Sequence, residues 1–130
     1  MIYTGIDLIE INRIAHSVRR HGERFLSLVY TADELKYCDG RTHALAARFV
    51  AKEAAAKALG TGLAGLGGAG VRWLDIEVIS DELRRPSLKL HRGAAQRAAE
   101  LGWREVSLSL SHSREHAIAM VVALAARGDL

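Results

Sequence analysis

The sequence has very little cysteine, which cross-links small proteins, and very little proline, which interrupts helices and strands. Among its 130 residues are one cysteine, Cys38, and one proline, Pro86, and no tract is of low complexity. A single cysteine excludes an internal disulfide and fits a reducing compartment. A catalytic role for the Cys38 thiol is left as an alternative. No apolar run reaches the about 18 residues that span a bilayer, and no signal-peptide pattern opens the chain. We therefore expect a cytoplasmic protein that does not enter a membrane.

Aromatic residues are scarce as well. They make up 5% of the chain and are not interleaved with its arginines, so the sequence gives no support for binding single-stranded nucleic acid. What the chain does have is a composition of 49% hydrophobic and 25% charged residues with a net charge of +3, which is ordinary for a globular protein. A domain of this length buries roughly two thirds of the surface of its unfolded chain. We expect one domain spanning residues 1–130.

Hydrophobic periodicity and capping residues predict the element order β-α-α-α-β-β-α-β-β. The expected strands cover residues 2–9, 72–80, 87–91, 104–111 and 116–125. The expected helices cover residues 12–21, a short segment opened by a Thr31–Glu34 capping box, 42–60 and 92–102. Because strands follow one another directly, we predict an α+β fold with an antiparallel sheet packed around the long central helix at 42–60.

Two carboxylates occupy positions that are otherwise apolar. Strand alternation places Asp7 on the opposite side from Ile6 and Leu8, and Glu53 shares a stripe of the central helix with apolar residues and Lys57. Taken alone, Glu53 and Lys57 form an ordinary pair worth about 0.2–0.5 kcal/mol. A second carboxylate in apolar surroundings must be paired, hydrated or bound to a cation. One Mg²⁺ shared by Asp7 and Glu53 would satisfy both, and it implies a phosphate-bearing ligand.

Three further motifs give only weak support for the activities they are known from. The loop at 60–70, which begins with Gly60, contains G-x-G-x-x-G twice, but it follows a helix, whereas a dinucleotide-binding fingerprint follows a strand. Ser111 beside His112 would suit a hydrolase, yet adjacent strand residues point to opposite faces. The H-x-x-E-H spacing from His112 to His116 needs a helix to bind zinc, and this segment predicts a hairpin. The small loop residues and the hydroxyl and imidazole groups can instead contact a base or phosphate oxygens, or face solvent.

A basic stripe follows the first expected helix. Arg13, His16, Arg20 and Arg24 fall on one side if the helical path continues through Gly22. Such a stripe is either a solvated face or a dock for an acidic protein partner. Two hypotheses therefore stand: an enzyme acting on a phosphate-bearing substrate, and a non-catalytic module that holds an acidic helix.

Several of these segments, in this order and spacing, resemble the holo-acyl-carrier-protein synthases. The matching pieces are "GIDLIEINRI" at 5–14, "ERFLSLVYTADEL" at 23–35, "ARFVAKEAAAKALGTG" at 47–62, "WLDIEV" at 73–78 and "SLSLSH" at 107–112. The resemblance covers nearly the whole chain and implies the 4′-phosphopantetheinyl transferase fold. It also implies transfer of 4′-phosphopantetheine from coenzyme A to a serine of an acyl carrier protein, giving adenosine 3′,5′-bisphosphate, in fatty acid or polyketide biosynthesis.

The resemblance assigns catalytic roles to three residues. It implies that Asp7 and Glu53 hold Mg²⁺ on the coenzyme A pyrophosphate and that Lys57 neutralises charge building there. The carrier serine must lose a proton as it attacks, and either Glu53 or a water held by the metal takes it. The sequence leaves these two alternatives open.

The resemblance further implies binding residues and an assembly. Arg48 and His112 match residues that contact coenzyme A phosphates, and we add Gly60 and Ser111 as candidate contacts. Family members are typically homotrimers with each active site between neighbouring subunits. Their first helix receives the acidic helix of the carrier protein, a role that here suits Arg13, Arg20 and Arg24.

Two departures from the family pattern stand out. Many relatives have Gly-Lys-Pro where this chain has Arg84-Arg85-Pro86, which puts a lysine contact in doubt. The loop at 60–70 is longer and richer in glycine than usual, which would alter the edge of a coenzyme A pocket.

Overall fold

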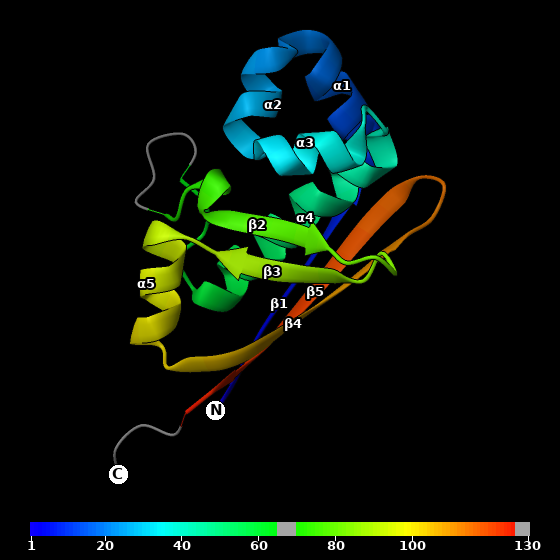
Figure 1. The fold of residues 1–130 in the computed structure, drawn as a ribbon. Helices are drawn as coiled ribbons and strands as arrows, with labels where there is room; N and C mark the ends of the chain where they lie inside the picture. The colour runs from blue at the N-terminus through cyan, green and yellow to red at the C-terminus, as the bar shows by residue number, and fades with distance from the viewer. Residues whose placement is uncertain (65–69, 127–130) are drawn as a thin grey trace.

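The computed structural model describes residues 1–64 and 70–126, so the predictions for residues 65–69 of the glycine-rich loop lie outside the described residues. Its strands are β1 (Ile2–Glu10), β2 (Ile76–Ser80), β3 (Pro86–Leu90), β4 (Trp103–His112) and β5 (His116–Ala125). Its helices are α1 (Ile11–His21), α2 (Glu23–Val29), α3 (Ala32–Cys38), α4 (Thr42–Leu59) and α5 (Arg92–Glu100), with a 3₁₀ turn at Trp73–Asp75. The predicted α+β fold is confirmed (Figure 1).

Two local predictions were wrong. The predicted order had three helices after the first strand, whereas the described chain has four, because Gly22 adopts a left-handed φ of 52° that ends α1 before α2 begins. The second strand begins at Ile76 rather than at residue 72, since the N–H of Asp75 donates to the carbonyl of Arg72 (3.0 Å) and closes a 3₁₀ turn. The basic stripe is therefore divided between two helices, and Arg24 lies on α2.

Two antiparallel sheets frame the molecule. The larger has the strand order β1-β5-β4, and the smaller pairs β2 with β3. In the larger sheet the register sets Asp7 opposite Ala119 and Ser111 opposite Ile118. Helix α4 lies between the two sheets, while α1, α2 and α3 gather at one end and α5 at the other (Figure 1). Over residues 1–64 and 70–126, no helix combines the length and the hydrophobicity needed to cross a membrane.

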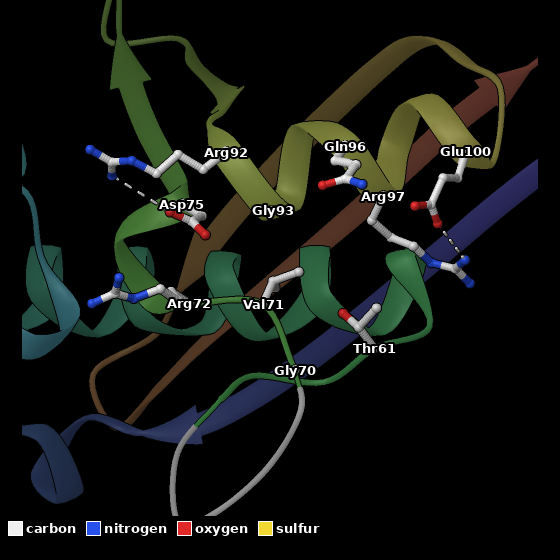
Figure 2. A pocket seen from close by; sticks show the side chains of 10 residues that line it. All are labelled: Thr61, Gly70, Val71, Arg72, Asp75, Arg92, Gly93, Gln96, Arg97 and Glu100. Atoms are coloured by element: carbon white, nitrogen blue, oxygen red, sulfur yellow. Dashed lines mark hydrogen bonds and ion pairs between the residues drawn. The ribbon is translucent and has the colours of Figure 1, made fainter.

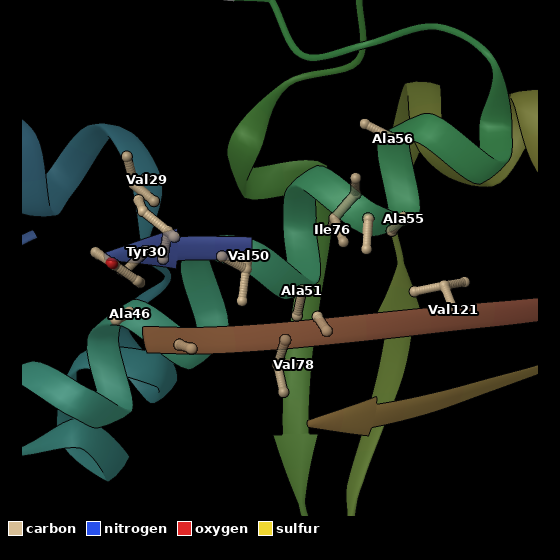
Figure 3. Packing of buried hydrophobic residues seen from close by; sticks show 14 of the residues in the cluster. Val29, Tyr30, Ala46, Val50, Ala51, Ala55, Ala56, Ile76, Val78 and Val121 are labelled. Atoms are coloured by element: carbon tan, nitrogen blue, oxygen red, sulfur yellow. The ribbon is translucent and has the colours of Figure 1, made fainter. Parts of the chain in front are cut away.

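Helix α4 is the centre of the core. It is rich in alanine, the strongest helix former, and ends at Gly60, which adopts a left-handed φ of 76°. Most of its sides are buried, and Figure 3 shows Val50 and Ala51 of α4 packed near Ile76 of β2 and Val121 of β5. A charged residue on these buried sides must therefore find a protein partner or face a cavity.

Strand β1 lies unusually close to α4. A side chain at Gly5 would collide with the backbone of Ala54, so glycine is required at this position. Asp7 is on the same inward face as Gly5, whereas Ile6 and Leu8 point outward and are 56% and 58% exposed. The close approach at Gly5 thus aims the Asp7 carboxylate at the central helix.

Candidate functional site

Asp7 and Glu53 line one cavity of about 240 Å³ between β1, α1 and α4, which we call the carboxylate cavity. Asp7 reaches it from the inward face of β1, and Glu53 reaches it from the middle of α4. Arg13 and Ser17 of α1 and Phe49 of α4 also line it, together with apolar residues of β1 and α1. Two acidic groups and one guanidinium therefore face the same small volume.

The charges in the carboxylate cavity are incompletely compensated. The Lys57 ammonium donates to Oδ1 of Asp7 (3.0 Å) and to the carbonyl of Ile6 (3.0 Å), whereas no ion pair to Glu53 is found among the described residues. Burial, and then the nearby Asp7 carboxylate, raise the pKa of Glu53 to about 7, against the opposing positive charges of Lys57 and Arg13. Glu53 consequently exchanges its proton near neutral pH.

The two carboxylates fit a hard divalent cation. Asp7 and Glu53 offer carboxylate oxygens, the ligands that Mg²⁺ prefers. In the described part of the chain, no group of three or more His, Cys, Asp or Glu side chains is placed to hold a metal ion. A cation in the carboxylate cavity would therefore take its remaining ligands from water or from a bound phosphate.

The residue before Glu53 has the opposite surroundings. Lys52 is fully buried, and its ammonium donates to Oε1 of Glu34 (2.7 Å) and to the carbonyls of Trp73 (3.1 Å) and Ile76 (2.7 Å). Burial lowers the pKa of Lys52, and the Glu34 carboxylate opposes that shift. This pair could not be predicted, because no local sequence pattern distinguishes Lys52 from a surface lysine.

Glu34 is held by the predicted capping box, which is confirmed. The Thr31 hydroxyl accepts from the Glu34 N–H (3.2 Å), and Oε1 of Glu34 accepts from the Thr31 N–H (2.8 Å). Oε2 of Glu34 also accepts from the N–H of Val78 (2.9 Å). One side chain thus caps α3, pairs with Lys52 and anchors β2.

A second cavity, of about 270 Å³, is lined by Arg48 of α4 and is called the arginine cavity below. Arg48 is 3% exposed, its guanidinium carbon lies 3.9 Å from the centre of the Tyr37 ring, and Nη2 donates to Oγ of Ser80 (3.0 Å). Its Nε has no hydrogen-bond partner, and within the described residues no carboxylate pairs with it. Because a buried guanidinium without a counter-ion is costly, this geometry suits an anionic ligand.

His112 lines the arginine cavity together with residues that sequence reasoning missed. His43 stacks on His112 with the ring centroids 5.0 Å apart, and Arg41 and Arg84 add two guanidinium groups. Arg41 could have been predicted, since it precedes Arg48 by seven residues, about two helical turns, and such spacing places both on the same side. His43 had none, and Arg84 was noticed only as a departure from the family pattern.

Several predicted residues lie outside both cavities. Gly60 caps α4 and Ser111 lies on the exposed face of β4, and neither lines the carboxylate cavity or the arginine cavity. Of the basic residues, Arg13 borders the carboxylate cavity, while Arg20 and Arg24 are exposed on α1 and α2. The roles assigned to these residues stay predictions.

A third cavity, of about 460 Å³, lies between α5 and the segment that leads into β2 (Figure 2). Arg72, Arg92 and Arg97 stand around it, and Oδ1 of the buried Asp75, 3.8 Å from Nη1 of Arg92, has no hydrogen-bond partner. None of the predicted site residues lines it. It shares no lining residue with either of the other two cavities.

Comparisons with known proteins show first the superfamily and then the family to which the chain belongs. A family model described as the 4′-phosphopantetheinyl transferase superfamily matches residues 3–121. The chain therefore belongs to the 4′-phosphopantetheinyl transferase superfamily, and to the holo-[acyl-carrier-protein] synthases within it, as the following relatives indicate.

A curated relative from Herpetosiphon aurantiacus, named holo-[acyl-carrier-protein] synthase, is 52% identical over 126 residues, covering 95% of this chain and 99% of that protein. The crystal structure of the holo-[acyl-carrier-protein] synthase from Neisseria meningitidis matches with a TM-score of 0.82 at 33% identity, covering 95% and 99% of the two chains. The Helicobacter pylori enzyme, solved in complex with coenzyme A, matches with a TM-score of 0.79 at 30% identity, covering 95% and 100%. Membership in this family makes the chain an enzyme, which sets aside the hypothesis of a non-catalytic binding module.

Proposed function

We propose that this enzyme transfers 4′-phosphopantetheine from coenzyme A to a serine of an apo acyl carrier protein, in fatty acid or polyketide biosynthesis. The observation that carries the proposal is the carboxylate cavity, which Asp7 and Glu53 line with incomplete charge compensation, while Lys57 pairs with Asp7 without lining the cavity itself. Transfer of a phosphate-linked group depends on positioning and on neutralising charge, and this set of groups is suited to both. Relatives named holo-[acyl-carrier-protein] synthase, one of them solved with coenzyme A, support the substrate class.

Mg²⁺ is the cation that we propose for the carboxylate cavity, with Asp7 and Glu53 as its protein ligands. The raised pKa of Glu53 supports this assignment, because a divalent cation would relieve the repulsion between the two carboxylates. When bound, the ion would draw charge away from the pyrophosphate oxygens of the substrate.

The residues of the chain itself supply positioning and proton transfer. Lys57, which is half exposed and pairs with Asp7, would neutralise charge on the pyrophosphate. As the carrier serine Oγ attacks the phosphorus that bears the pantetheine arm, the bond to the leaving adenosine 3′,5′-bisphosphate breaks and the serine proton must be taken up. Either the Glu53 carboxylate or a water that the cation would hold accepts that proton.

The arginine cavity is the proposed subsite for a phosphate of coenzyme A. The buried Arg48, with its unpartnered Nε, and the neighbouring His112 offer hydrogen-bond donors to phosphate oxygens. Gly60 and Ser111 stay candidate contacts for the remainder of the coenzyme A molecule.

We further propose a homotrimer with each active site between neighbouring subunits. The carboxylate and arginine cavities share no lining residue, which allows different subunits to supply the two parts of one site. The outer face of the larger sheet supports self-association, since a lone subunit would leave its apolar residues in water. These exposed residues are Ile2, Ile6, Leu8, Met120 and Leu124. Light scattering after size-exclusion chromatography should give the mass of three chains, and the mass of one chain would contradict the proposal.

The proposed carrier dock is the exposed surface of α1 and α2 that bears Arg13, Arg20 and Arg24. Its positive charge complements an acidic helix, and Arg13 links it to the carboxylate cavity. A cytoplasmic location, expected from the single cysteine, is part of the same proposal.

Mass spectrometry tests the proposed reaction. An apo acyl carrier protein incubated with the enzyme, coenzyme A and Mg²⁺ should gain the mass of a phosphopantetheine group. The matched control is the Glu53→Gln enzyme, which keeps the size of the side chain and should leave the carrier unmodified. Failure of the unaltered enzyme to modify any of several apo carriers would contradict the proposal.

A further inference from the structure

The turn between β2 and β3 holds an arginine in a backbone conformation that disfavours it. Arg84 has a φ of 63°, in the left-handed region that glycine adopts without steric cost and that other residues rarely adopt. The turn is well ordered, since Oδ1 of Asp81 accepts from the N–H groups of Leu83 (2.8 Å) and Arg85 (2.8 Å), and the N–H of Arg84 donates to the carbonyl of Asp81 (2.9 Å). Local hydrogen bonding therefore imposes the strained conformation on Arg84.

No local contact of its side chain explains why an arginine occupies this position. Among the described residues, no carboxylate forms an ion pair with Arg84. Its side chain does line the arginine cavity, together with Arg41 and Arg48, whereas the neighbouring Arg85 does not. Strained residues cluster at ligand sites, where the side chain has a use that the backbone alone does not explain.

The arginine cavity carries a second, independent sign of a missing anion. Arg48 is buried, and its Nε lacks any hydrogen-bond partner. The guanidinium of Arg41 donates to the carbonyls of Cys38 (2.9 Å) and Tyr37 (2.7 Å). Those of Arg48 and Arg84, with His43 and His112 at the cavity wall, still exceed what a singly charged group needs. A phosphate monoester carries between one and two negative charges at neutral pH and accepts paired hydrogen bonds from guanidinium forks.

We propose that Arg84 is a specificity-determining residue that binds the phosphate monoester of coenzyme A and so distinguishes coenzyme A from dephospho-coenzyme A. The inference rests on the proposed function, because it assumes that the arginine cavity receives this substrate. Arg84, in the turn that Asp81 closes, and Arg48 line the same cavity. Arg84 thus adds a contact from the smaller sheet to those that α4 supplies.

Calorimetric titration with coenzyme A and with dephospho-coenzyme A tests the inference. We expect Arg84→Gly to weaken coenzyme A binding about three- to tenfold, the loss of a charge-assisted contact at an exposed site, and to leave dephospho-coenzyme A binding within about twofold. The same substitution should raise Tm by about 2–5 °C, because glycine relieves the strained φ.

The matched control is Arg92→Gly. Arg92 also has a positive φ, of 42°, and lies outside the arginine cavity, so this variant removes one positive charge and frees the backbone there. It also removes the 3.8 Å ion pair with Asp75, so stability is compared separately from the affinity ratio. It should leave the ratio of the two affinities unchanged, and Arg84→Lys, which keeps the charge but loses the fork, should give an intermediate ratio.

Two results separate the inference from the proposed function. An unaltered affinity ratio in Arg84→Gly, with coenzyme A still preferred as in the unaltered enzyme, would overturn the role of Arg84 and leave the proposed function standing. Failure of the unaltered enzyme to bind coenzyme A at all would overturn the proposed function and the inference together.

Discussion

Lys52 and Glu53 are neighbours on α4, yet their charges meet opposite conditions. The Lys52 ammonium is fully buried, bonded to the Glu34 carboxylate at 2.7 Å and to two backbone carbonyls. The Glu53 carboxylate faces a cavity that also contains Asp7, and its pKa is raised to about 7. The Lys52 ammonium therefore has a full set of protein partners, whereas the Glu53 carboxylate does not.

The difference separates a structural charge from a charge that is left open to a ligand. A buried charge with every partner present fixes the positions of the elements it joins, and removing one partner strongly destabilises them. A charge with missing partners lowers stability until a ligand arrives, and such groups gather at functional sites. Arg48 follows the second pattern, since it is buried without a counter-ion in the described chain.

The largest expected effect is on turnover, from changes on the Glu53 side of the helix. Glu53→Gln or Asp7→Asn should lower kcat by about 10²–10⁴-fold, because each removes a charge needed for proton transfer or for cation binding. Steady-state transfer to the carrier measures the loss, and circular dichroism should show both variants folded. A variant with turnover within threefold of the unaltered enzyme would remove that residue from the site.

On the Lys52 side, the expected effect is on folding. Lys52→Met should lower the free energy of unfolding by about 3–5 kcal/mol, because it leaves the Glu34 carboxylate buried without its cation. Urea unfolding measures the change. A loss below about 1 kcal/mol would mean that Glu34 is satisfied by its backbone donors alone, and the contrast between the two sides would fail.

A smaller effect is expected on the free energy of unfolding of Glu53→Gln relative to the unaltered enzyme, and this difference should depend on pH. Because the folded pKa of Glu53 is raised from 4.5 to about 7, ionised Glu53 destabilises the folded state above pH 7, and this penalty disappears below pH 4.5. With EDTA present, the variant should be more stable than the unaltered enzyme by about 1–2 kcal/mol at pH 8, after allowance for screening by solvent.

At pH 4 the two proteins should be equally stable, since Glu53 is then protonated in both the folded and the unfolded states. Denaturant unfolding at the two pH values measures the difference. A variant less stable than the unaltered enzyme at pH 8 would show that Glu53 is a structural charge like Lys52.

The smallest expected effect lies at the carrier dock beyond the carboxylate cavity. Charge reversal at Arg20 and Arg24, which are exposed and do not line that cavity, should raise the KM for the carrier about three- to tenfold at low salt, without weakening coenzyme A binding. Kinetics at varied carrier concentration measure the first quantity, and calorimetry the second. An unchanged carrier KM would exclude this surface as the dock.

The sequence alone predicted the surroundings of Glu53 better than those of Lys52. Asp7 and Glu53 could be paired in advance because each stands among apolar neighbours, where a charge calls for an explanation. Lys52 could not, since α4 is buried on most sides and a helical wheel then separates no inner face from an outer one. The partner of Lys52, Glu34, was predicted only as a helix cap.

The long-range features were beyond local patterns. Strand alternation and the α+β fold followed from periodicity, but α2 was missed because it begins directly after the glycine that ends α1. The arginine cavity joins Tyr37, Arg48 and Arg84 from three separate elements, and only the folded chain brings them together. Arg48 itself was assigned through the family resemblance rather than from its neighbours in the sequence.

The measurement that tests the central claim most directly is the thermal shift caused by coenzyme A, with Mg²⁺ or with EDTA, at pH 8. If Asp7 and Glu53 form a site that a divalent cation completes, Mg²⁺ should enlarge the rise in Tm caused by coenzyme A in the unaltered enzyme and not in Glu53→Gln. An equal contribution of Mg²⁺ in both proteins, or none in the unaltered enzyme, would contradict the account.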